Sequence, residues 1–161
     1  MRLTTKGRYA VTAMLDIALH GSERAVKVAE VSRRQGISRS YLEHLLGHLH
    51  QSGLVQSTHG PGGGYQLARG KDRISIADII DAVEEVDATQ CHGKRDCRDG
   101  RECMTHVLWE NLNLHIAHYL SSVTLAALIE ERQRKESPEA GHVWMPIQDP
   151  RAVSGANLEM K

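Results

Sequence analysis

The chain has 161 residues, and its 20 Lys or Arg balance 20 Asp or Glu to give a formal net charge of zero. That length suits one domain, or one domain with an appendage, and a neutral total would normally discourage a nucleic-acid partner. We find neither the features of a signal peptide nor an apolar stretch approaching about 18 residues. We therefore expect a cytoplasmic protein with no membrane partner.

The neutral total conceals an uneven distribution of charge. Residues 1–70 contain nine Lys or Arg and four acidic residues, a surplus of five positive charges, together with five histidines. An electropositive front half favours an anionic partner, with DNA the leading candidate. A surplus of this size is weak evidence alone, because charge runs are usually solvated faces, so the pattern of elements has to decide.

Two helices are predicted before residue 36. The first begins at Thr4 or Thr5, either of which can cap it, and carries an apolar stripe at helical spacing. The second covers 28–35 and places Ala29 and Val31 on its inner face. A glycine follows each helix, as expected at a helix C-terminus.

A third helix is predicted to begin near Arg39, after a glycine-containing turn. Its apolar stripe follows the i, i+3, i+4, i+7 spacing of a core-facing helix and consists of Leu42, Leu45, Leu46 and Leu49. Two short helices joined by such a turn, over about 28–51, are typical of a helix-turn-helix. The motif alone is only moderately specific, since any three-helix core contains similar joints.

A β-hairpin is predicted directly after the third helix, over about 54–68. Residues 54–58 and 65–68 suit its two strands, and the glycine-rich segment 59–64 suits its tip. A hairpin in this position is the wing of a winged helix. The tip does not suit a nucleotide-binding loop, because it lacks the Gly-Lys-Ser/Thr ending and joins two strands. Its glycines would instead allow close approach to a sugar–phosphate groove.

Three further helices are predicted. A short one is capped by Ser75 with Asp78, a long one runs from about 105 to 122, and a last one spans about 124–134. The long helix carries one apolar stripe, formed by Leu108, Leu112, Ile116, Tyr119 and Val123. That stripe either packs on the preceding helices or pairs with the same helix of a second copy in a homodimer.

The fold class predicted is therefore mainly α: a winged helix-turn-helix with a small β-hairpin wing and a long dimerisation helix. Residues 1–87 would form the DNA-binding region, 88–106 a cysteine-containing loop, and 105–135 the dimerisation and C-terminal helices. Residues 136–161 are rich in proline and polar residues and are expected to be a disordered tail.

The predicted loop holds all three cysteines of the chain. Cys91, Cys97 and Cys103 are each separated by five residues, and His106 follows the last after two more. A disulfide is disfavoured by the odd count and the expected compartment, and glycines and charges between the cysteines argue against burial. Thiolates with one imidazole suit zinc or an iron–sulfur cluster. Zinc sites usually contain cysteine pairs two to four residues apart, so the wide spacing favours iron–sulfur modestly.

Four segments in order resemble the Rrf-type winged-helix family of transcriptional regulators. They are the N-terminal Met-Arg-Leu-Thr-Thr-Lys-Gly-Arg-Tyr-Ala, the turn and helix at 36–43, the Gly-Pro-Gly-Gly-Gly-Tyr wing at 60–65 and the cysteine loop. The likeness runs from residue 1 to about 130. It implies a homodimeric regulator that holds one 2Fe–2S cluster per subunit, supplied by the cluster assembly machinery. With its cluster such a regulator represses the assembly genes, and without it still binds a second class of sites.

The resemblance also implies roles for individual residues. Cys91, Cys97, Cys103 and His106 would be the cluster ligands. Spacing independently favours His106 over His92 and His115, because two intervening residues can bring it round beside Cys103. The family includes nitric-oxide sensors in which an N-terminal carboxylate helps to hold a larger cluster, and Arg8 at the corresponding position disfavours that variant.

We expect the DNA contacts to come from three segments. Phosphates would be met by Arg2, Lys6 and Tyr9, and the minor groove by His59, Gly60, Pro61, Gly62 and Gly63. The major groove would be entered by Ser38, Arg39, Ser40, Tyr41, Glu43 and His44. Histidines at 48, 50 and 59 stand where we expect arginine, which would weaken phosphate attraction.

One residue has two open interpretations. Glu43 would accept a hydrogen bond from cytosine, or it would only stabilise its helix, since Ser40 and Glu43 have the spacing of a capping box. Among other classes of function, an enzyme has no visible catalytic constellation, and an electron carrier would not need the wing. A zinc-stabilised winged-helix protein is the serious rival.

Overall fold

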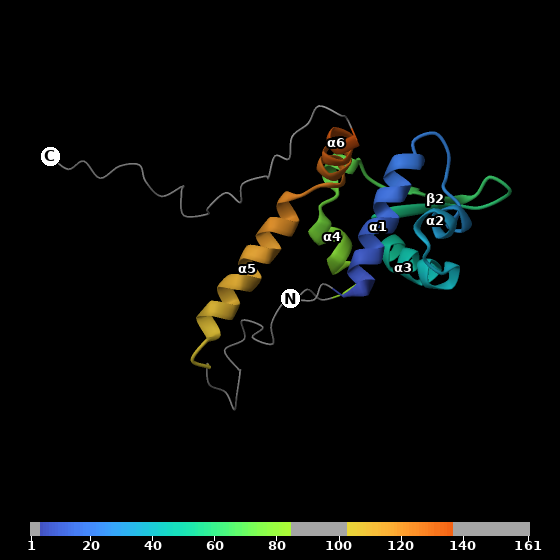
Figure 1. Cartoon of the computed structure of the whole chain (residues 1–161). Coiled ribbons are helices and arrows are strands. Elements are labelled where there is room, and N and C mark those ends of the chain that lie inside the picture. The colour runs from blue at the N-terminus through green and yellow to red at the C-terminus, as the bar shows by residue number, and fades with distance from the viewer. Residues whose placement is uncertain (1–3, 85–102, 137–161) are drawn as a thin grey trace.

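The computed structural model of the chain describes residues 4–84 and 103–136 (Figure 1). Its elements, in order, are α1 (Thr5–His20), α2 (Val28–Gln35), α3 (Arg39–Gln51), β1 (Val55–Thr58), β2 (Gly64–Leu67), the 3-10 turn η1 (Lys71–Arg73), α4 (Ile76–Asp81), α5 (His106–Ser122) and α6 (Leu125–Glu136). Arg2, Cys91, Cys97, the predicted loop up to residue 102 and the predicted tail from residue 137 lie outside the described residues. The described elements confirm a mainly helical fold with one small hairpin.

Helix α1 is the central element of the fold and contacts α2, α3, β2, α4 and α6. Four of its side chains are fully buried, namely Ala10, Ala13, Met14 and Ile17. Of the two caps considered, Thr4 is the N-cap, and its side chain accepts a hydrogen bond from the Gly7 backbone N–H at 3.5 Å. The small side chains in the stripe let the neighbouring helices approach α1 closely.

Helices α2 and α3 form the helix-turn-helix predicted from the sequence. The turn between them places Gly36 in the left-handed region at φ 66°, and the Ser32 hydroxyl donates to the Ile37 carbonyl at 2.6 Å. Val31 is fully buried, but Ala29 is exposed, so the prediction of a shared inner face was wrong. Residues two apart on a helix point in different directions, and only Val31 faces the core.

The wing is the antiparallel pair β1–β2, with Val55 opposite Leu67 and Thr58 opposite Gly64. Its second strand is also tied to the segment between α1 and α2. The Val26 N–H donates to the Tyr65 carbonyl at 2.9 Å, and the Tyr65 N–H donates back at 2.8 Å. A Cβ on Gly64 would lie 2.4 Å from the Val26 carbonyl oxygen, so this approach requires glycine.

Helix α4 begins with the predicted capping box, in which the Ser75 hydroxyl accepts from the Asp78 N–H at 3.1 Å and the Ser75 N–H donates to the carboxylate at 2.9 Å. The segment before α4 pairs with the segment between α5 and α6. The Ile76 N–H donates to the Val123 carbonyl at 2.8 Å, and the Leu125 N–H donates to the Ile74 carbonyl at 3.0 Å. These two bonds fix the C-terminal end of α5 to the core.

Helix α5 lies beside α4 and extends away from the helices around α1, with its N-terminal end farthest from them (Figure 1). Leu120 and Val123, at its C-terminal end, belong to the core, as does Leu125 at the start of α6. Among the described helices, none combines the length and apolarity needed to span a membrane.

Candidate nucleic-acid interface and cysteine centre

Helix α3 separates an apolar inner face from a polar outer face. Leu42, Leu45, Leu46 and Leu49 are fully buried, as the sequence predicted. The outer face of α3, as we define it, consists of Arg39, Ser40, Glu43, His44 and His48; the first four are exposed and the last is half-buried. The residues predicted to enter the major groove therefore lie on the solvent side of the second helix of the motif, where such a helix contacts bases, except Tyr41, which is half-buried and packs against the core.

Glu43 does not cap its helix. The N-cap of α3 is Ser38, whose side chain makes no capping hydrogen bond, and Ser40 lies inside the first turn. The Ser40–Glu43 capping box, one of the two interpretations left open by the sequence, is therefore not formed. The Glu43 carboxylate instead accepts a hydrogen bond from Arg39 Nε at 2.8 Å, and both side chains are exposed. An exposed ion pair of this kind is weak and can exchange one partner for another.

Two histidines of the outer face touch each other. His44 and His48 lie one helical turn apart, with their Nε2 atoms 3.2 Å from each other. The ring centroids are 4.6 Å apart and the ring planes cross at 86°. His44 was predicted to contact DNA, and its pairing with His48 is a feature that only the structure shows.

Helix α1 contributes a neighbouring contact surface. The rings of Tyr9 and Tyr41 meet edge to face, with centroids 5.9 Å apart, so these two predicted DNA contacts from α1 and α3 are adjacent. Lys6 lies one turn before Tyr9 on α1 and is half-buried. The structure thus places Tyr9 of α1 against Tyr41 of α3, whereas Arg2 lies outside the described residues.

The tip of the hairpin extends beyond α2 and α3 (Figure 1). His59, Gly60, Pro61 and Gly62 are exposed, and Gly63 is half-buried. The Gly63 N–H donates to the Gly60 carbonyl at 2.9 Å, and Gly60 has φ 105°, so the tip is a tight turn that depends on glycine. The predicted wing contacts are therefore accessible to a large ligand.

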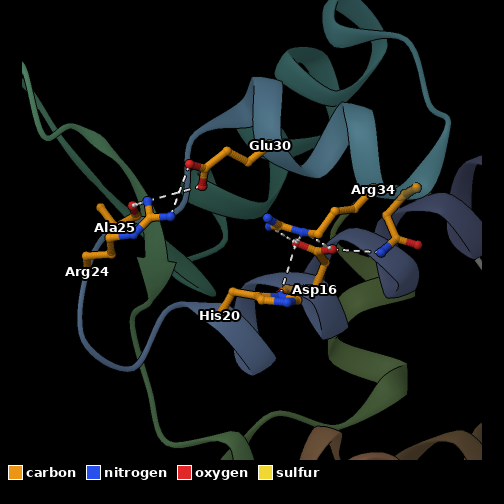
Figure 2. Close-up of polar contacts among 7 residues, drawn as sticks. Asp16, His20, Arg24, Ala25, Glu30 and Arg34 are labelled. Carbon is orange, nitrogen blue, oxygen red and sulfur yellow. Dashed lines mark hydrogen bonds and ion pairs between the residues drawn. The ribbon is translucent and has the colours of Figure 1, made fainter.

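A buried carboxylate ties α1 to the end of α2, and the sequence analysis missed it. Asp16 is 1% exposed and accepts hydrogen bonds from Arg34 Nε at 2.9 Å, Arg34 Nη2 at 2.5 Å and Gln35 Nε2 at 2.7 Å. His20 Nδ1 lies 3.7 Å from the same carboxylate (Figure 2). Burial alone would raise the pKa of Asp16, but the hydrogen bonds from Arg34 and Gln35 and the charge of Arg34 hold that pKa below its usual value.

A second, exposed ion pair lies nearby. Arg24 donates from both Nη atoms to the two carboxylate oxygens of Glu30, each at 3.1 Å (Figure 2). Arg24 also donates to the Ala25 carbonyl at 3.4 Å. The Arg24 hydrogen bond lowers the pKa of Glu30. This pair links the start of α2 to the loop before it at the surface, where solvent screens its charges.

Two of the four predicted metal ligands are described, and one turn of chain joins them. The His106 N–H donates to the Cys103 carbonyl at 3.0 Å, at the N-terminal end of α5. The Cys103 sulfur lies 3.7 Å from the Thr105 hydroxyl, and His106 is only 4% exposed. Within residues 4–84 and 103–136, no group of three or more His, Cys, Asp or Glu side chains is placed to hold a metal ion.

The alternative histidine, His115, is exposed, and its Nδ1 lies 2.7 Å from the Asn111 carbonyl oxygen of its own helix. It is nine residues beyond His106 on α5, which places it about 13 Å further along the helix axis. His115 therefore could not join Cys103 in the same small site as His106. This geometry favours His106 over His115 as the partner of Cys103.

Helix α5 leaves much of its apolar surface uncovered within the chain. Leu108 is 59% exposed and Tyr119 is 52% exposed, and Leu112 and Ile116 are half-buried. Val123, the last member of the predicted dimerisation stripe, is instead 7% exposed and belongs to the core of its own chain. The described surface of α5 thus offers four of the five predicted residues to a partner.

Residues 3–131 match the Rrf2 family, described as iron-dependent transcriptional regulators. The chain is 54% identical over 134 residues to the HTH-type transcriptional regulator IscR of Erwinia tasmaniensis, covering 83% of this chain and 81% of that protein. Relatives of the same name from Sodalis glossinidius and Vibrio cholerae are 54% and 53% identical.

Solved structures agree with the sequence comparison. T. potens IscR superposes with a TM-score of 0.74 at 33% identity, covering 87% of this chain and 94% of that one. CymR, described as the global cysteine regulator of B. subtilis, gives a TM-score of 0.71 at 29% identity, covering 81% and 98%. The winged helix-turn-helix fold class predicted from the sequence is thereby confirmed.

Proposed function

Because the chain belongs to the Rrf2 family of iron-dependent transcriptional regulators, we propose that it senses iron–sulfur cluster supply and converts it into a choice of DNA sites. It is a DNA-binding regulator and not an enzyme, as the sequence predicted. In this proposal the protein represses cluster assembly genes when it holds a 2Fe–2S cluster and binds a second class of sites as apoprotein. The observation that carries the DNA-binding part is the polar, solvent-facing outer face of α3.

The outer face of α3 would enter the major groove. Arg39 and Glu43 are already paired at 2.8 Å, so DNA would have to separate them or contact them together. Separated, Arg39 can donate to guanine and the Glu43 carboxylate can accept from the cytosine amino group. Each good base contact contributes about 1–3 kcal/mol of discrimination. Glu43 is therefore proposed as a base-contacting residue, held in position by Arg39 before DNA arrives.

Two other segments would hold the protein on the DNA backbone. Lys6 and Tyr9, on α1, are proposed to contact phosphates beside the groove that α3 enters, together with Arg2. The exposed wing tip is proposed to reach the minor groove, where its glycines leave room for the sugar–phosphate chain. His59 on that tip would attract phosphates less strongly than an arginine would.

The residues present fit a metal cluster in the chemistry of their donor set. Cys91, Cys97, Cys103 and His106 supply three thiolates and one imidazole, and thiolates with histidine are the ligands of some 2Fe–2S centres. Cys103 and His106 share one turn at the start of α5, so both can face the same small volume. Whether a cluster is bound would depend on the supply of iron and sulfide and on exposure to oxidants. The protein's part is to hold it and to respond to its presence.

The response is proposed to pass through α5. Two of the proposed ligands, Cys103 and His106, lie at the N-terminal end of this helix. Its exposed Leu108 and Tyr119 and its half-buried Leu112 and Ile116 are proposed to pair with those of a second copy in a homodimer. If the cluster binds one dimer arrangement more tightly than the others, cluster binding would shift the population toward that arrangement. The separation of the two α3 helices would change with it. The cluster assembly machinery is the proposed source of the cluster.

The test combines metal analysis with DNA binding. Protein purified without oxygen should be red-brown and contain about two irons and two sulfides per chain, as a 2Fe–2S centre requires. Cys103→Ala should lose both the colour and the holo site preference, whereas Met104→Ala, at the fully exposed neighbouring position, should keep them. Colourless protein with stoichiometric zinc would support a zinc-stabilised regulator, and identical site preferences for apo and holo protein would contradict the sensing mechanism.

A further inference from the structure

The outer face of α3 contains a pair of imidazoles at a spacing that suits a metal ion. His44 and His48 lie at positions i and i+4, and their Nε2 atoms are 3.2 Å apart. Neither belongs to the predicted cysteine centre, and the only acidic side chain on this part of the described surface, Glu43, is paired with Arg39. His44 is exposed and His48 is half-buried, so the pair can be reached from solvent.

Two histidines one turn apart on a helix are the arrangement that binds zinc in the His-Glu-x-x-His motif, because both rings then project from one face. Zinc–nitrogen bonds are about 2.0–2.1 Å long. An ion placed at that distance from two nitrogens 3.2 Å apart would subtend an N–Zn–N angle of about 103°, close to tetrahedral. The two nitrogens already have a suitable separation, and the imidazole rings need only rotate so that both lone pairs point at the ion instead of along the N–N line.

We propose that His44 and His48 form a binding site for one divalent transition-metal ion of the zinc type. In the metal-free pair, one ring donates its Nε2 proton to the other ring. On binding, that proton moves to the Nδ1 of the donor ring, so that both Nε2 lone pairs face the ion and no proton is released. Water completes the coordination. Two protein ligands are fewer than the three or four of resident zinc sites, so the ion exchanges freely with solution.

The site lies on the surface proposed to contact DNA, yet its existence does not depend on that proposal. It is distinct from the thiolate loop and would make the outer face of α3 sensitive to free metal rather than to cluster supply. An occupied site fixes both imidazoles and adds two positive charges to this face. Metal binding can therefore be measured in the absence of DNA, and its failure would leave the proposed function intact.

The experiment uses the full-length protein and the residue-resolved NMR signals of its histidine rings. Titration with zinc chloride should shift the Nε2 resonances of His44 and His48 together, along one binding curve. Magnesium should leave them in place, because it prefers oxygen ligands. Because each histidine ring gives its own signal, zinc bound at His44 and His48 can be distinguished from zinc bound by the cysteines.

Matched variants decide the result. His48→Gln should abolish the zinc-dependent shift of His44, whereas His50→Gln, which removes an exposed histidine from the same helix, should leave it unchanged. Zinc should also raise the thermal midpoint of the His50→Gln protein more than that of the His48→Gln protein. Unshifted His44 and His48 signals in zinc, or a His44 shift that survives His48→Gln, would overturn the proposal.

Discussion

Replacing Asp16 by asparagine is expected to destabilise the protein substantially, although the side chain keeps its shape. The native residue is 1% exposed, and its carboxylate accepts hydrogen bonds from the side chains of Arg34 and Gln35. An amide would turn an NH₂ group toward one of them and leave the guanidinium without a counter-charge. Hydrogen bonds to charged groups contribute about 1.5–3 kcal/mol each, and breaking a buried pair costs about 3–5 kcal/mol.

The structure lowers the expected loss to or below the bottom of the range of about 3–5 kcal/mol for a buried pair. The Arg34 side chain is 28% exposed, so water can recover part of its hydration once the carboxylate is gone. We expect a decrease of about 2–3 kcal/mol in the free energy of unfolding at pH 7. For a chain of this size the midpoint of thermal unfolding should fall by roughly 5–10 °C.

Urea and thermal unfolding, followed by circular dichroism, would measure this loss. The matched control is Glu30→Gln, which removes a bidentate partner that is 21% exposed and lies beside a largely exposed Arg24, and which should change stability far less. Equal effects of Asp16→Asn and Glu30→Gln would refute the reasoning, because burial would then contribute nothing to the strength of the pair.

The same variant predicts a dependence on pH. The pKa of Asp16 in the folded protein is below its usual value, so the stability that the carboxylate contributes is fully present above the unfolded pKa of about 4. That contribution is lost as the pH falls through the folded pKa. The advantage of the native protein over Asp16→Asn should therefore be constant from pH 7 to about pH 5 and shrink in more acidic solution. An advantage that grows on acidification would contradict the assignment.

Three further outcomes are expected. Lys6→Ala should weaken binding to all DNA sequences alike and reduce the slope of log affinity against log salt by about 1, and a sequence-selective loss would contradict a phosphate contact. Glu43→Ala and Glu43→Gln should both alter site preference in competition assays with little change in thermal stability, because the ion pair with Arg39 is exposed. Leu108→Asp should shift the protein toward monomer in analytical ultracentrifugation, whereas Glu110→Gln on the same helix should not.

Local patterns in the sequence were sufficient for much of the fold. The four leucines of α3, the glycine at 36 and the Ser75–Asp78 capping box each act over a few residues, and each was found where the sequence placed it. The hairpin also followed from its glycine-rich tip. These signals are reliable because the interactions that produce them connect neighbours in the chain.

The sequence analysis failed in two situations: where one residue spacing fits more than one local structure, and where two interacting residues are far apart in the chain. Ser40 and Glu43 had capping-box spacing, but the helix begins one residue before Ser40, so the same residues lie within its first turns. Asp16 is 18 residues from Arg34, and no periodic pattern links them. An acidic residue between Leu15 and Ile17, near the buried stripe of α1, was the one available signal.

The candidate site was predicted unevenly for the same reason. Residue types and spacing identified the outer face of α3, but the contacts between Tyr9 and Tyr41, and between His44 and His48, depend on how side chains orient after folding. On α5 the apolar residues cover more than one face. The sequence could not show that Val123 would be used by the core while Leu108 stays exposed.

The attachment of α5 has a mechanical consequence. Paired backbone bonds join Ile76 to Val123 and Ile74 to Leu125, so the helix is held at its C-terminal end and Cys103 lies beyond the opposite end. A helix of 17 residues is about 25 Å long. Pivoting it by only about 10° around the fixed end would move the cysteine end by about 4 Å. In the proposed mechanism the helix would thus act as a lever arm, and a small displacement of the end beside Cys103 would become a rotation about the strand-like junction beside α4.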